Sequence, residues 1–265
     1  MGQNTHDHRT VGLRIEVAGE TNVGMKRNHN EDNFSIFEES GLYIVADGMG
    51  GHASGEVASK MAVDALRDFF QATAQDPERT WPYKMDRSKG YEENRLITGI
   101  KLANLRIYES AQRDARQRGM GTTIVTLFAV EDGVYVGHVG DSRVYRVRDK
   151  KIEQLTEDHS LLNDYIKMKR LTPEEIANFP HKNVIVRALG MKDTVKVDTR
   201  FETPQENDVY MLCSDGLSGP VTDEEILEIT LANQDLKGAA SGLIARANEN
   251  GGPDNITVVL ARWIA

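Results

Sequence analysis

Four aspartates, each placed where an apolar run meets a glycine-containing turn, are the feature that most constrains the fold of this chain. Residues 42–46 are apolar, and the acid that ends this run precedes a glycine-rich turn. Similar junctions recur along the sequence, and their acids are Asp47, Asp141, Asp215 and Asp254. Turns with so little side-chain bulk leave carboxylates and backbone carbonyls open to a ligand. If the runs are strands of one sheet core, several of these acids can converge at one edge.

The order of the expected elements indicates an α+β fold. Apolar residues repeat at helical spacing from Val57 to Phe70 and again between 92 and 117, which predicts two amphipathic helices. Beyond Gly121 the pattern becomes that of short strands with turn signals such as Asp132-Gly133. The remaining expected elements are strands at 122–130, 134–139, 143–148 and 151–155, a strand at 208–213, helices after 222 and over 236–248, and a last strand at 256–260. The stretch 157–190 is less regular, but Thr172-Pro173-Glu174-Glu175 is a capping box with proline at the first helical position and predicts a short helix. Without regular strand–helix alternation, a doubly wound parallel sheet is disfavoured and a sheet core covered by helices is expected.

Composition excludes several classes of protein. The formal charge of −9, with scattered lysines and arginines, argues against a nucleic-acid-binding surface. The single cysteine, Cys213, excludes disulfides and zinc-knuckle sites within the chain. No stretch approaches the length of a membrane span. We therefore expect a cytoplasmic protein with no nucleic-acid or membrane partner, a disordered lead at 1–12 and one domain at 13–265.

Converging carboxylates have a definite chemical consequence. Unpaired carboxylates packed closely repel one another, so they need raised pKa values or bound cations. Two divalent cations would meet this need, and such sites hydrolyse phosphate esters by activating a water. Aspartate is also common in turns, so the residues alone leave a metal site and a set of structural turns equally open.

The same glycine-rich turn also matches a loose dinucleotide-binding pattern. Gly48, Gly50 and Ala53 have the required spacing, and Asp68 lies near the distance expected of a ribose-binding acid. However, Asp68 falls inside a helical pattern and no βαβ unit follows. Asp47 would also face the pyrophosphate. A dinucleotide site is therefore disfavoured.

Eight short motifs, in order over essentially the whole chain from about residue 13, carry a family resemblance. They occupy residues 27–32, 45–52, 121–123, 139–143, 155–159, 187–190, 213–217 and 252–257. With these motifs the chain resembles bacterial members of the metal-dependent PP2C (PPM) protein serine/threonine phosphatases. The resemblance implies a four-layer α-β-β-α sandwich, in which two antiparallel sheets are flanked by antiparallel helix pairs.

The resemblance also implies a metal site with two Mn²⁺ or Mg²⁺ ions and room for a third. In it Asp47 bridges the two ions, and the Gly48 carbonyl binds one of them. Asp215 and Asp254 complete the protein ligands of the first ion. Asp141, together with Asp215, matches the position of the third ion in bacterial members.

The remaining implied roles concern water and substrate. Glu31 and Asp32 act through metal-bound waters, and Arg27 grips the substrate phosphate with a planar fork suited to tetrahedral oxygens. The implied reaction is in-line attack on phosphorus by a metal-bridging water. Met49 stands where many eukaryotic members have a histidine proposed as the general acid, so the proton is expected to come from water. His52 is a candidate substrate-binding residue.

The implied partners are phosphorylated proteins, including a bacterial serine/threonine kinase whose action the enzyme would oppose. Residues 160–190 correspond to the flap beside the cleft in this family, where substrate preference is thought to lie. A monomer is expected. Two alternatives stay open: a catalytically silent scaffold, which the intact set Arg27, Asp47, Asp215 and Asp254 disfavours, and a hydrolase of small phosphate esters.

Overall fold

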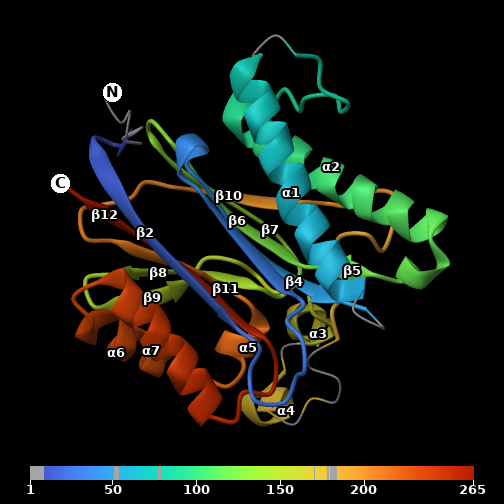
Figure 1. Ribbon diagram of the computed structural model, residues 1–265. Coiled ribbons are helices and arrows are strands. Elements are labelled where there is room, and N and C mark those ends of the chain that lie inside the picture. The colour runs from blue at the N-terminus through green and yellow to red at the C-terminus, as the bar shows by residue number, and fades with distance from the viewer. Residues whose placement is uncertain (1–8, 51–53, 77–78, 170, 178, 180–183) are drawn as a thin grey trace.

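Two antiparallel sheets, packed face to face, form the centre of the molecule (Figure 1). The computed structural model describes residues 9–50, 54–76, 79–169, 171–177, 179 and 184–265. The first sheet has the order β1 (Arg9–Thr10), β2 (Leu13–Asn22), β12 (Ile256–Ile264), β11 (Val209–Cys213), β8 (Arg143–Arg148), β9 (Lys151–Gln154). The second has the order β10 (Asp198–Glu202), β7 (Gly133–Val139), β6 (Ile124–Val130), β4 (Leu42–Met49), β3 (Asp32–Phe37), and β5 (Gly121–Thr122) pairs with the end of β4.

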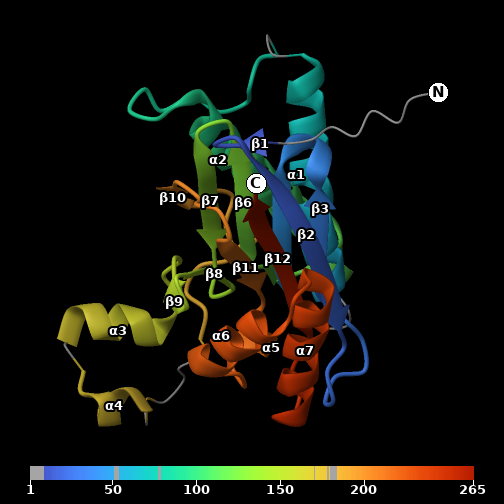
Figure 2. The ribbon, with the colours of Figure 1, turned by 90° about the vertical axis from the view of Figure 1, so that its left-hand side faces the viewer.

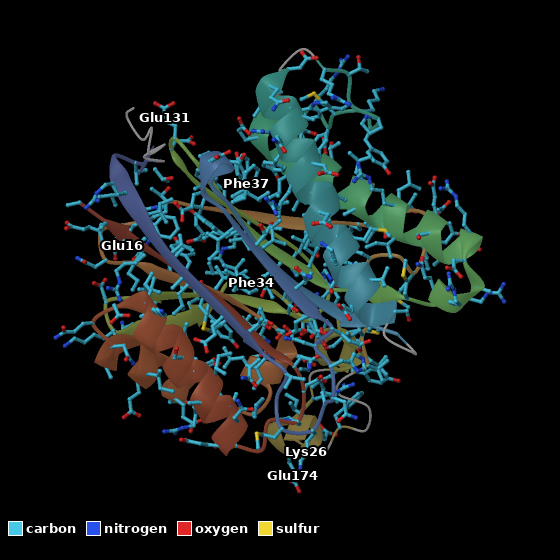
Figure 3. All side chains as sticks on the ribbon, viewed as in Figure 1. Glu16, Lys26, Phe34, Phe37, Glu131 and Glu174 are labelled. Atoms are coloured by element: carbon cyan, nitrogen blue, oxygen red, sulfur yellow. The ribbon has the colours of Figure 1, made fainter. Side chains whose placement is uncertain are left out.

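Helices cover the outer face of each sheet, which gives the predicted four layers (Figure 2). The second sheet is covered by α1 (Ser54–Gln75) and α2 (Tyr91–Arg113), and the first by α6 (Asp223–Ala232) and α7 (Leu236–Glu249), beside the short α5 (Asp215–Ser218). Three apolar clusters fill the spaces between the four layers. Figure 3 shows Phe34 of β3 among the side chains between the sheets.

Local sequence explains how the helices begin and pack. Thr222 and Glu225 form a reciprocal capping box at the start of α6, which satisfies two free backbone donors. Gly99 of α2 faces α1, and a Cβ at this position would lie 2.4 Å from Leu66 Cδ1. The absence of a side chain there lets the two helices approach closely.

The structure differs from the sequence-based expectation at the N-terminus. Residues 1–8 lie outside the described part, but Arg9–Thr10, expected within a disordered lead, form β1 and pair with β2. The turn between them places Val11 at φ 51° and Gly12 at φ 80°. Valine is unfavourable at positive φ, so the sequence gives little sign of this hairpin.

Two further differences concern loops and helix ends. Helix α2 ends at Arg113 rather than continuing to 117, because Asp114 adopts an extended conformation and caps the short 3₁₀ helix Ala115–Gln117. The stretch 157–190 also contains α3 (Leu161–Lys169), which was not expected, whereas α4 (Pro173–Ala177) begins after the predicted capping box of Thr172 and Glu175. Both helices stand apart from the sheets in Figure 2. Among the described residues, no helix combines the length and apolar composition that a membrane crossing requires.

Candidate active site

The acids predicted from the sequence lie at one end of the sandwich, where both sheets contribute. Asp32 of β3 and Asp47 of β4 are direct cross-strand partners in the second sheet. Asp215 follows β11 and Asp254 precedes β12, neighbouring strands of the first sheet. In Figure 3 Lys26, which precedes Arg27 in the chain, lies at this end, and Glu131 lies at the opposite end.

The last residues of β4, which include Asp47 and Gly48, are held in place by two threonines. The backbone N–H of Asp47 donates to Thr123 Oγ1 at 3.1 Å, and the Asp47 carbonyl accepts from Thr123 N–H at 2.9 Å and Thr122 Oγ1 at 2.8 Å. A Cβ on Gly48 would lie 2.1 Å from the Gly55 carbonyl oxygen. Only glycine fits there, so the backbone at Gly48 runs directly against the start of α1.

Asp32 is buried, and the hydrogen bonds that the described residues make to its carboxylate all reach one oxygen. Its Oδ2 accepts from Ser214 Oγ at 2.8 Å and from Thr257 Oγ1 at 2.7 Å. Ser214 directly follows β11 and Thr257 lies in β12, so both donors come from the first sheet. Asp32 Oδ1 is buried without a hydrogen-bond partner among the described residues. Asp141 Oδ1 is likewise buried without a hydrogen-bond partner, and so is Glu31 Oε1, although His29 Nε2 lies 3.4 Å from it. Buried carboxylate oxygens without donors are costly in a protein, and they are the ligands that hard cations prefer.

Burial and mutual repulsion raise the pKa values of these acids. Burial, followed by the charges of neighbouring aspartates, raises the pKa of Asp47 well above its usual value. Burial raises the pKa of both Asp32 and Asp141 to about 7. The pKa of Asp215 is also raised, again mainly by burial. Each of these shifts includes repulsion from another acid of the group, so the charges of the side chains act on one another.

Arg27 brings the positive charge to this site. Its Nη2 donates to Asp254 Oδ2 at 2.8 Å, and about half of its side chain is exposed. The hydrogen bond from Arg27 to Asp254 raises the pKa of the guanidinium, with smaller contributions from Glu31 and Asp47. An exposed fork beside a cluster of buried acids is placed to meet an anion arriving from solvent.

Asn255 is a structural part of the site to which sequence reasoning assigned no role. Its Oδ1 accepts from Glu31 N–H at 2.8 Å, and its Nδ2 donates to the carbonyls of Val23 and His29 at 2.9 and 3.0 Å. The side chain is almost fully buried. It therefore fixes the loop that carries Arg27 against the last turn. In the sequence, the sign of this role was the position of Asn255 directly after the turn acid Asp254.

A cleft of about 490 Å³ opens beside the acids. Its lining includes Asp141, Asp215 and Asp254 on one side, and Arg143 and Ser160 near the start of the flap. Met49 ends β4, as the motif requires. His52, the candidate substrate-binding residue, lies outside the described residues.

The donor set fits divalent cations. Its members are Glu31, Asp32, Asp47, the Gly48 carbonyl, Asp141, Asp215 and Asp254, all hard oxygen ligands. Several of their oxygens are buried and lack a hydrogen-bond donor among the described residues. The sequence thus predicted which acids the fold would bring together.

Comparison with known proteins agrees with this geometry. The family described as Protein phosphatase 2C matches residues 25–257. The serine/threonine phosphatase stp of Listeria monocytogenes serovar 1/2a is 39% identical over 248 residues, which cover 91% of this chain and 92% of that protein.

Solved structures give the same assignment. The serine/threonine phosphatase PstP/Ppp of Mycobacterium tuberculosis superposes with a TM-score of 0.82 and 33% identity, over 96% of this chain and all of that one. A catalytic domain of PstP in complex with two manganese ions superposes with a TM-score of 0.78, 33% identity and the same coverage. The chain belongs to the bacterial branch of the protein phosphatase 2C family and is a metal-dependent protein serine/threonine phosphatase.

Proposed function

We propose that this phosphatase hydrolyses phosphoserine and phosphothreonine in proteins at the acid cluster between the two sheets. In this proposal two divalent cations are held by Asp47, the Gly48 carbonyl, Asp215 and Asp254. The observation that carries it is a group of buried, mutually repelling acids from both sheets, three of which line an open cleft. In the described residues, one buried oxygen on each of Glu31, Asp32 and Asp141 has no hydrogen-bond donor. The two manganese ions in the PstP catalytic domain support the choice of cation.

When bound, Mn²⁺ or Mg²⁺ supplies a water nucleophile for in-line attack on phosphorus and neutralises charge on the phosphoryl oxygens. Glu31 and Asp32 are proposed to orient water with Oε1 and Oδ1, which accept no hydrogen bond from the described residues. Ser214 and Thr257 hold the Asp32 carboxylate in one rotamer by donating to its other oxygen. A third ion at Asp141 and Asp215 belongs to the same proposal.

Arg27 is proposed to bind the substrate phosphate. Its guanidinium lies at the rim of the cluster, where it can offer two parallel N–H groups to two phosphoryl oxygens. Met49 has no ionisable group, so the leaving alkoxide takes its proton from water. His52 remains a proposed contact to the substrate. Hydrolysis at this site would oppose a serine/threonine kinase, and phosphorylated proteins, the kinase included, are the proposed partners.

Phosphate release from a phosphothreonine peptide tests the proposal, with the wild-type enzyme in Mn²⁺, in Mg²⁺ and in EDTA. We expect turnover with metal and none after chelation. Asp47→Ala is expected to abolish turnover while keeping the circular dichroism spectrum of the wild type. A folded protein without turnover in either metal would refute hydrolysis and favour a silent scaffold. Full activity of Asp47→Ala would refute the assignment of the site.

A further inference from the structure

The two described ends of the flap, residues 160–190, meet at His159. The Leu161 N–H donates to the Val184 carbonyl at 2.8 Å, and the Val186 N–H donates to the His159 carbonyl at 2.9 Å. The backbone of His159 is therefore part of the short ladder that closes the base of the flap.

The side chain of His159 holds the turn that carries Asp141. The His159 N–H donates to the Gly140 carbonyl at 2.9 Å, and the Gly140 N–H donates to His159 Nδ1 at 3.0 Å. Gly140 has φ 115°, and a Cβ there would lie 2.6 Å from Thr123 Cβ. The turn is thus held between Thr123, which also holds Asp47, and His159.

The hydrogen bonds of His159 fix its tautomer. Because Nδ1 accepts from Gly140, the ring proton of the neutral imidazole lies on Nε2. Nε2 donates to Asp198 Oδ2 at 2.9 Å, and Arg187 Nη1 donates to the same oxygen at 3.1 Å. Arg187 Nη1 also lies 2.9 Å from His159 Nε2, so both N–H groups converge on this one carboxylate oxygen. Both ring nitrogens are therefore occupied, and the ring is fixed in one orientation.

His138, His159 and Asp198 offer ligand atoms that all lie within 4.8 Å of one another, but their hydrogen bonds disfavour a cation. His138 Nε2 donates to the Glu157 carbonyl at 2.9 Å. The guanidinium of Arg187 already neutralises Asp198, and a metal on His159 Nε2 would displace the proton that the tautomer requires there. The group is a hydrogen-bond relay from the end of the flap to the Asp141 turn.

We propose that His159 is a positioning residue for Asp141. By accepting the Gly140 N–H, its ring fixes the turn and so sets the direction of the Asp141 carboxylate. By accepting the Val186 N–H, its carbonyl links the same turn to the base of the flap. The inference rests on the proposed role of Asp141 as a metal ligand. Groups that orient a ligand in this way affect metal affinity or activity about 10–100-fold when removed.

The test compares His159→Ala with His159→Asn in the full chain. Asparagine places Oδ1 near the position of Nδ1, so it can still accept from Gly140, whereas alanine cannot. We expect His159→Ala to raise the Mn²⁺ concentration for half-maximal activity about 10–100-fold and His159→Asn to recover most of that loss. Amide exchange at Gly140, followed by NMR, should accelerate in His159→Ala only.

His138→Gln is the matched control. His138 stacks on the His159 ring with centroids 4.6 Å apart but has no hydrogen bond to Gly140 among those of the described residues. Glutamine can keep the donor to the Glu157 carbonyl, so this variant tests packing alone, and we expect the Mn²⁺ dependence of the wild type. An equal shift in His138→Gln, or in His159→Asn and His159→Ala alike, would overturn the proposal.

Asp141→Asn separates this inference from the assignment of the site. We expect it to shift the Mn²⁺ dependence at least as far as His159→Ala. An unchanged dependence in Asp141→Asn would remove Asp141 from the metal site and overturn both statements. If the Mn²⁺ dependence shifts in Asp141→Asn but not in His159→Ala, only the proposed role of His159 is overturned. A wild type without turnover would refute the proposed function, and Mn²⁺ titration by calorimetry would then compare the same variants.

Discussion

Asp47 is a residue whose burial is expected to lower the stability of the metal-free fold while it provides a ligand for the proposed cations. Its carboxylate is buried near Asp32, Asp141, Asp215 and Asp254, and burial together with these charges raises its pKa well above the usual value. A charge in such a place is unfavourable without a partner, and a cation is the partner that the hard oxygens around it favour. The residue is therefore expected to destabilise the protein without metal and to stabilise it with metal.

Asp47→Asn tests this reversal. In EDTA at pH 8 the variant is expected to melt at a higher temperature than the wild type. Folding of the wild type must either bury the charge of Asp47 or take up a proton, because burial and neighbouring acids raise its pKa, whereas a neutral amide requires neither. In Mn²⁺ the order should reverse, because the variant loses a ligand, and turnover should fall about 10²–10³-fold or more. Thermal melts followed by circular dichroism in both media check the prediction. A variant less stable than the wild type in EDTA would contradict it.

At the scale of elements, turns rather than strands determine the geometry of the site. Gly216 packs so closely against the last turn that a Cβ would lie 1.8 Å from the Asn255 carbonyl oxygen. The two turns that carry Asp215 and Asp254 are thus in backbone contact.

Gly216→Ala should therefore separate these two turns. The clash is with backbone, which cannot rotate away, so we expect a loss of about 3 kcal/mol or more in the free energy of unfolding and weaker Mn²⁺ binding. Gly90→Ala is the control, since its Cβ would meet only Tyr135 Oη, at 3.7 Å. It should stay within about 1 kcal/mol of the wild type in urea titrations. Similar losses in both variants would contradict the clash.

Asn255 joins elements that are distant in sequence, and its removal gives a second prediction. Asn255→Ala deletes three hydrogen bonds to the loop from Val23 to Glu31, so we expect a loss of about 2–4 kcal/mol in urea unfolding. It should also raise KM for a phosphopeptide, because that loop carries Arg27. Asn255→Asp keeps the shape but sets a carboxylate against two carbonyls, and it should be at least as destabilised. If KM is unchanged in both variants, the position of this loop does not affect substrate binding.

The strand-end acids could be predicted from sequence because each combines local signals: an apolar run, a carboxylate and a glycine. Most strands and the two long helices followed from periodicity, although β10 (Asp198–Glu202) was not predicted, and the four layers followed from the family resemblance. Asn255, Thr123 and His159 could not be assigned their roles, because their partners lie 19 or more residues away and depend on which turns meet. The β1 hairpin was missed because valine occupies a position of positive φ.

At the scale of the whole molecule, the site lies where two separately packed halves meet. One half is the second sheet with α1 and α2, which supplies Asp32 and Asp47; the other is the first sheet with α6 and α7, whose ends supply Asp215 and Asp254. Cations bound between these acids would cross-link the halves. A ligand that binds only the folded state stabilises it by about 2.7 kcal/mol at one hundred times its dissociation constant.

The raised pKa values of the buried acids predict how the stability of the fold depends on pH. The pKa of Asp32 and of Asp141 is about 7 in the fold, against a usual value of 3.8. In EDTA the folded state therefore binds more protons between these values, and the contribution of these acids to stability is lost as pH rises from about 4 through 7. Because cations require the deprotonated acids, the gain in melting temperature on adding Mn²⁺ should grow over the same interval.

Melting temperatures at pH 5, 6, 7 and 8, in EDTA and in Mn²⁺, check this dependence. The lowered pKa values of His138 and His159, caused mainly by burial, act in the opposite direction below about pH 6.5, so the acids must be isolated from them. The double variant Asp32→Asn, Asp141→Asn serves this purpose, because it keeps both histidines. We expect the loss of stability toward pH 8 in EDTA to be smaller in the variant than in the wild type. An equal loss in both proteins would show that these two acids do not hold protons in the fold.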